Sequence, residues 1–170
     1  GGKIYYLDPD GTRNGDLPNG TENYVFTEDI ALAEYEAKLE DIHTNPANGK
    51  QLVFGAQEDG LYIMDVDIRF DVSGDVDLAG STVQITTALE DDNTVGTFDN
   101  PDNLTWSAGN YIYVQEDGGT QPDNEIWRLQ PSYPIGPLTY IAQADTETSG
   151  SIDLSGQVGL RHASVRLFSV

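Results

Sequence analysis

Short apolar runs that alternate with polar residues and end at turns dominate this chain. Residues 4–7 run into Asp8-Pro9-Asp10-Gly11, a turn favoured by the fixed φ of Pro and the free φ of Gly. Two later pairs of runs form hairpins: 51–55 pairs with 61–66, and 103–106 pairs with 111–114 across Ala108-Gly109-Asn110. Residues 125–129 and 138–142 continue the meander. The pattern predicts an all-β fold of antiparallel meanders, in which most residues are strand or turn.

One segment has a different period. Residues 28–38 carry Ile30, Leu32, Ala33 and Ala37 behind Thr27, a candidate N-cap. This spacing predicts one short helix.

A turn followed by an apolar or aromatic strand recurs at residues 2–8, 60–65 and 124–129, about sixty residues apart. Four-stranded propeller blades take roughly 40–45 residues each, so 170 residues hold about four at most. A partial propeller would leave an open edge, which proteins avoid. The chain also opens without Met and stops inside an alternating pattern. We therefore expect residues 1–170 to be part of a larger β-propeller, completed by further sequence in cis or by a partner chain.

The charge excludes one class of function. With 29 Asp and Glu against 8 Lys and Arg, the formal net charge is −21, which would repel a nucleic acid backbone. No run approaches the roughly 18 apolar residues of a membrane span, and no signal peptide is recognisable. There is no Cys, so the chain forms neither a disulfide nor a Cys-ligated zinc site.

Two acidic segments are candidates for chemistry. In the first, Glu40 and Asp41 precede a strand and the turn from Asn45 to Gly49. In the second, a Pro101-Asp102-Asn103 turn opens a hairpin whose return strand ends in Glu116-Asp117-Gly118-Gly119. Carboxylates at a propeller channel suit hard cations, which prefer oxygen ligands. A solvated acidic turn is the alternative for the first segment, and an ordinary β-turn at a blade rim is the alternative for the second.

Together these segments resemble the PhoX-type alkaline phosphatases, secreted bacterial six-bladed propellers. Lys38-Leu39-Glu40-Asp41 with Asn45-Pro46 matches the family's Arg-Pro-Glu-(Trp/Asp) and Asn-Pro in spacing, with Lys-Leu in place of Arg-Pro. Pro101-Asp102-Asn103-Leu104, Trp106 and the strand ending in Glu116-Asp117 match a second motif, and 124–129 resembles the strand that follows. The resemblance covers about residues 2–129. Sugar-lactonase propellers share hairpins of the second kind.

The resemblance implies a secreted, periplasmic or cell-surface phosphomonoesterase that uses calcium and iron. It implies that Glu40 and Asp117 are metal ligands, with Glu116 as a third, and that the substrate is a phosphate ester or another small molecule. The family's iron centre includes a Cys that this chain lacks. Either that segment is missing or the iron site is not preserved, so we expect the chain alone to be catalytically incomplete.

Bound cations would give this acidic surface an electropositive pocket for phosphate, with Lys38 or Arg128 as weaker helpers. His43 fits a base or a ligand, but a lone strand His is more often structural. Two other functions stay open: a non-catalytic calcium-stabilised propeller that binds a partner or builds a surface assembly, and a lactonase-type hydrolase with one calcium. Our hypothesis for the site is that Glu40 and the Glu116–Asp117 pair meet at one channel mouth and share a cation.

Overall fold

The structure is a computed structural model that describes residues 3–8, 17–29, 38–57, 59–90, 98–116, 124–131 and 138–143, and the backbone of 151–153 and 166–168. Every element of regular secondary structure within these ranges is a β-strand. They are β1 (Tyr6–Asp8), β2 (Thr21–Thr27), β3 (Lys38–Thr44), β4 (Gln51–Gln57), β5 (Gly60–Asp67), β6 (Thr82–Glu90), β7 (Pro101–Trp106), β8 (Ile112–Glu116), β9 (Glu125–Leu129), β10 (Thr139–Gln143), β11 (Ser151–Asp153) and β12 (Arg166–Phe168). The predicted all-β fold is confirmed.

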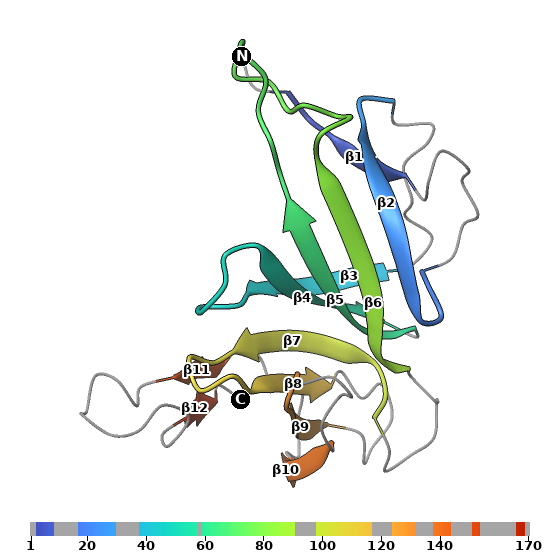
Figure 1. The fold of residues 1–170 in the computed structure, drawn as a ribbon. Helices are drawn as coiled ribbons and strands as arrows, with labels where there is room; N and C mark the ends of the chain where they lie inside the picture. The colour runs from blue at the N-terminus through green and yellow to red at the C-terminus, as the bar shows by residue number, and fades with distance from the viewer. Residues whose placement is uncertain are drawn as a thin grey trace.

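The strands form two main sheets and a small hairpin (Figure 1). A curled six-stranded sheet has the order β1-β2-β6-β5-β4-β3, a four-stranded sheet has the order β10-β9-β8-β7, and β11 pairs with β12. All these pairs are antiparallel. Strands β3–β6 and β7–β10 are thus two successive four-stranded meanders, the connectivity of propeller blades, and β2 and β1 extend the first of them.

The predicted hairpins are confirmed, and their turn residues explain them. Between β7 and β8, Asn110 takes the left-handed conformation, with φ 59°. Its side-chain Oδ1 accepts a hydrogen bond from the Trp106 indole N–H at 3.1 Å, and its backbone N–H donates to the Ser107 carbonyl at 3.0 Å. Asn is among the few residues that tolerate this conformation, so the turn is encoded locally.

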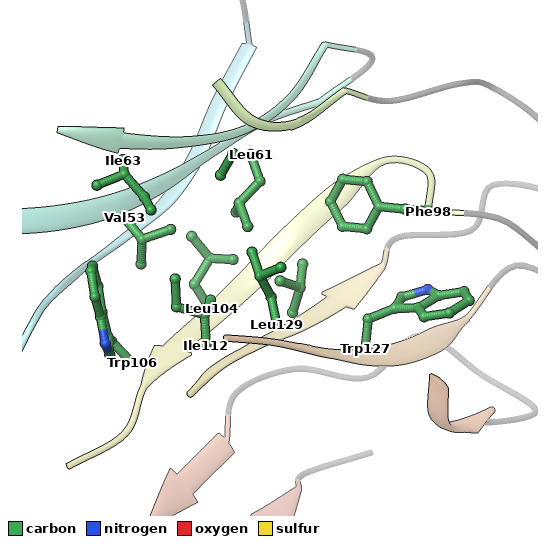
Figure 2. Packing of buried hydrophobic residues seen from close by; sticks show 11 residues of the cluster. Val53, Leu61, Ile63, Phe98, Leu104, Trp106, Ile112, Trp127 and Leu129 are labelled. Atoms are coloured by element: carbon green, nitrogen blue, oxygen red, sulfur yellow. The ribbon is translucent and has the colours of Figure 1, made fainter. Parts of the chain in front are cut away.

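The core lies between the two sheets (Figure 2). Val53, Leu61 and Ile63 project from β4 and β5 toward the four-stranded sheet, which buries a larger set of apolar side chains against them. That set is Leu104, Trp106, Ile112, Val114, Trp127 and Leu129, joined by Phe98. Fully burying side chains of this size contributes about 1.5–3 kcal/mol each, so this interface is the main source of stability.

The opposite face of the six-stranded sheet holds a second apolar cluster, formed by Tyr24, Phe54, Ala56, Tyr62, Val83 and Ile85. Phe54 and Tyr62 are cross-strand partners whose rings stack with centroids 5.3 Å apart. The central strands β4 and β5 are therefore buried on both faces, which explains their nearly continuous apolar sequence.

The two sheets approach each other closely where β4 meets the start of β7. A Cβ atom added to Gly55 would lie 3.3 Å from both the Cβ and the carbonyl oxygen of Pro101. Nearby, a β-bulge between Leu39 and Ile42 lets Asp41 leave its own sheet. Its Oδ2 accepts a hydrogen bond from the Leu104 backbone N–H on β7 at 2.9 Å, and its Oδ1 accepts one from the Ile42 N–H at 2.8 Å.

We expect Asp41→Ala to lower the free energy of unfolding by about 1–2 kcal/mol, because the Leu104 N–H would lose a charge-assisted acceptor in a half-buried place. Urea titration followed by tryptophan fluorescence measures this loss. Asp41→Asn keeps an acceptor and should retain much of the stability. Equal stability of wild type and Asp41→Ala would contradict this role.

Three sequence expectations need adjustment. Most of the predicted helix, residues 30–37, lies outside the described residues, and Lys38, its predicted end, instead begins β3. The Thr27 hydroxyl does accept a hydrogen bond from the Asp29 N–H at 3.0 Å, as an N-cap residue would. Glu40 and Asp41 lie within β3 rather than before it, because the bulge accommodates them. Pro101 is the first residue of β7 rather than part of a turn.

No helix that is long and apolar enough to cross a membrane occurs in the described part of the chain.

Candidate functional site

Glu116 lies at the end of β8, on the face that packs against the six-stranded sheet. Ile112 and Val114 point into the core between the sheets, and side chains two residues apart share a face, so Glu116 points the same way. Pro101 is its partner on β7. The residue is only 1% exposed, which is unusual for a carboxylate.

The hydrogen bonds of Glu116 satisfy only half of its carboxyl group. Oε1 accepts a hydrogen bond from the Asp99 backbone N–H at 2.7 Å, while Oε2 is buried and has no hydrogen-bond partner among the described residues. The Trp127 indole N–H lies close enough to favour the charged form, although it makes no well-formed hydrogen bond. A buried carboxylate oxygen without a partner is costly, so it needs a proton or a cation.

Burial raises the pKa of Glu116 from 4.5 to about 8. The hydrogen bond from the Asp99 N–H opposes this rise, and the nearby negative charges of Glu125 and Asp99 add to it. None of the main causes of the shift is a Lys or Arg. A carboxyl group held in this state, beside other carboxylates, is a typical feature of functional sites.

Glu125 is the neighbour of Glu116 on β9. Gln115 pairs with Ile126, so the next step of the ladder brings Glu116 beside Glu125 at the first position of β9. Glu125 is 8% exposed, and it lies on the same face as Trp127 of the core. The sequence analysis did not single out Glu125. The predicted order of the 111–114 and 125–129 strands could have identified it, because it places the two acids at the same end.

Glu40 lies on β3, within the bulge that faces β7. Its side chain is 21% exposed and forms an ion pair with Lys38, which also donates to Gln57. Lys38 therefore offsets the charge of Glu40. Arg128 stacks on the Tyr111 ring at 4.9 Å from its centroid, and His43 Nδ1 lies 3.0 Å from the Thr44 carbonyl oxygen.

The predicted sharing of one cation by Glu40, Glu116 and Asp117 stays a prediction. Asp117 lies outside the described residues, so its distance to the other two acids is open. Among the side chains that the structure does describe, no three of Asp, Glu or His converge closely enough to hold one metal ion.

The donor chemistry at Glu116 nevertheless fits a hard cation. Its unpartnered oxygen and the adjoining Glu125 carboxylate place two acidic groups at the same end of β8 and β9. Calcium takes carboxylate oxygens and completes its shell with backbone carbonyl groups and water. Glu116 and Glu125 can therefore supply the carboxylate ligands of a calcium ion, but not a complete set.

A hollow of about 520 Å³ lies elsewhere on the six-stranded sheet and is lined mainly by polar side chains of β2, β5, β6 and the turn between β3 and β4. Gln84 donates to Asn23 at 3.1 Å and Lys50 pairs with Asp67 along its walls. These polar side chains form a hydrogen bond and an ion pair with one another, so we interpret the hollow as an ordinary solvent-exposed face of the sheet.

Comparison with known proteins gives no match: no family model, no curated protein and no solved structure is similar to this chain at a significant level.

Proposed function

We propose that this chain is a calcium-binding part of a phosphomonoesterase of the PhoX type, with Glu116 as its principal ligand. The observation that carries the proposal is the buried Glu116 carboxyl group, which has one oxygen without a partner and lies beside Glu125. The motifs around Glu40 and Glu116 support the phosphatase part of the proposal through their resemblance to that family.

In this proposal, Glu116 and Glu125 hold calcium at the end of the core between the two sheets. The Asp99 N–H fixes one oxygen of Glu116, so the other is directed toward the ligand. Bound calcium would supply positive charge where a phosphate ester otherwise meets a chain of net charge −21. Glu40, Asp117 and iron belong to the proposal through the resemblance alone, as does a secreted, periplasmic or cell-surface location.

One observation favours a second candidate, a non-catalytic propeller stabilised by calcium. Glu116 is almost fully buried between two sheets, and a cation there would hold the sheets together without contact with substrate. A lactonase-type hydrolase that uses one calcium is the third candidate. All three candidates need the same cation site. They differ in whether the protein catalyses a reaction and in which bond it hydrolyses.

Turnover of p-nitrophenyl phosphate by the full-length protein tests the phosphatase proposal. We expect hydrolysis that chelator abolishes and calcium restores, and a loss of at least about 100-fold in kcat/KM for Glu116→Gln. Glu28→Gln, an exposed acid with a side chain 53% accessible, is the matched control and should keep full activity.

Metal analysis of the same preparation separates the candidates. Iron together with several calcium ions favours the phosphatase. Calcium alone, with hydrolysis of a lactone but not of the phosphate ester, favours the lactonase. Calcium binding that Glu116→Gln removes, without any hydrolysis, favours the non-catalytic propeller.

A further inference from the structure

The face of the four-stranded sheet opposite Glu116 buries two amide side chains. Gln115 pairs with Ile126, and Asn124 lies two residues before Ile126, so both amides project from the same face. Gln115 is 1% exposed and Asn124 is 2% exposed. Each of these amides directly precedes one of the two acids, Glu116 on β8 and Glu125 on β9.

Three polar atoms of this amide pair have no hydrogen-bond partner within the part of the chain that the structure describes: Gln115 Nε2, Gln115 Oε1 and Asn124 Oδ1. Leaving a buried amide unpaired opposes folding, and Gln115 would bear this cost at both of its polar atoms. Native proteins rarely retain such groups without a bound partner.

The unpaired set determines the chemistry of that partner. It contains a donor, Gln115 Nε2, and two acceptors, so the partner must both accept and donate hydrogen bonds. A metal ion would satisfy the two oxygens and leave the donor unpaired. Water satisfies all three, and a buried water typically makes about three hydrogen bonds.

The sheet register supplies a suitable separation. Gln115 and Asn124 are diagonal neighbours, which lie about 7–8 Å apart on one face of an antiparallel pair. The two amides do not bond to each other directly. Two hydrogen bonds of about 2.8 Å to one water meet at its roughly tetrahedral angle, so they span about 4.6 Å between the outer polar atoms, which side chains of this length can present.

We propose that Gln115 and Asn124 bind one buried water that bridges β8 to β9. The bridge fixes the spacing of the two strand ends, and thereby the spacing of Glu116 and Glu125 on the other face. Gln115 and Asn124 are then positioning residues for the acid pair. This second part rests on the proposed calcium site, whereas the water bridge itself does not.

The bridge is tested first in the wild-type protein without calcium. Proton NMR should show cross-relaxation between the Gln115 side-chain NH₂ and a long-lived water, with the resonance assigned by its loss in Gln115→Met. A Gln115 amide that shows no contact with bound water would overturn the proposal.

Melting temperatures of variants provide the second test. Gln115→Met removes the amide but keeps an unbranched side chain of similar length, and we expect Tm to fall by about 3–10 °C as Asn124 loses its water. If the Gln115 amide were simply buried and unpaired, Met would raise Tm.

We also expect Asn124→Leu to lower Tm less in the Gln115→Met background than in wild type, since both residues share one bridge. A raised Tm, or additive effects of the two substitutions, would contradict the bridge.

Calcium titration of Gln115→Met tests the positioning role, with an expected loss of affinity of about 10-fold because both carboxylates are retained. Unchanged affinity would restrict the bridge to a structural role and refute the positioning role. If wild type binds no calcium, the proposed function fails, while the NMR and melting experiments still decide on the bridge.

Discussion

Chelation of calcium is expected to lower the melting temperature of the wild-type protein by about 5–11 °C. A ligand at 100 times its Kd stabilises the folded state by about 2.7 kcal/mol, and each kcal/mol shifts Tm by about 2–4 °C in a chain of this size. The reason lies at Glu116, where the unpartnered Oε2 and the charge of Glu125 oppose folding until a cation neutralises them. Differential scanning calorimetry at increasing free calcium measures the shift.

Glu116→Gln supplies the control for this shift. The amide oxygen of Gln can still accept the Asp99 N–H hydrogen bond, but the variant has lost the charge that attracts calcium. Its Tm should therefore respond little to calcium. A calcium response of equal size in wild type and Glu116→Gln would show that calcium binds to other carboxylates. No response in either protein would refute a calcium site.

The stability of the calcium-free protein should fall as pH rises from 4.5 to 8, and Glu116 should cause a distinct part of that fall. Its pKa is raised to about 8 in the folded state, so the folded state binds its proton more tightly than the unfolded state. The stabilisation is fully present below pH 4.5 and is lost by pH 8. At about 1.4 kcal/mol per pKa unit, the upper bound is about 5 kcal/mol.

The difference between wild type and Glu116→Gln isolates this part of the pH dependence. General repulsion within a chain of net charge −21 also grows with pH, but both proteins share it almost equally. In chelator at pH 9, Glu116→Gln should be the more stable protein by several kcal/mol in urea titrations. The difference should shrink toward pH 5. A difference independent of pH would show that Glu116 does not titrate in this range.

The parts of the fold that the sequence predicts correctly are local. Asn110 determines the turn between β7 and β8, and the alternation on each side of a turn gives the strands that pair across it. Strands β2 and β6 did not stand out, and their pairing joins residues about sixty positions apart, such as Thr21 and Thr86. Such pairing depends on burial of the Tyr24 and Val83 side chains in a shared cluster, which local pattern does not reveal.

The same limit applies to the site. Glu116 was identified because it ends a strand in a recognisable motif, but its burial depends on the six-stranded sheet that covers it. The sequence groups Asp41 with Glu40 in a candidate metal-binding segment. In the structure, the Asp41 carboxylate accepts a hydrogen bond from the Leu104 N–H across the junction of the two sheets. That role requires the bulge between Leu39 and Ile42, which no turn residue signals.

The junction of β3 and β7 has a consequence for how the two meanders stay separate. Strands β3 and β7 are each the edge strand of a sheet. Adjacent edge strands with free N–H groups tend to form hydrogen bonds with each other and join into one continuous sheet. Here Pro101 has no N–H to offer, and Asp41 occupies the N–H of Leu104. These two residues therefore oppose hydrogen-bonded pairing of the two edge strands. A chain in which both were replaced by β-branched residues would risk merging its ten strands into one sheet, or recruiting the edge of another molecule.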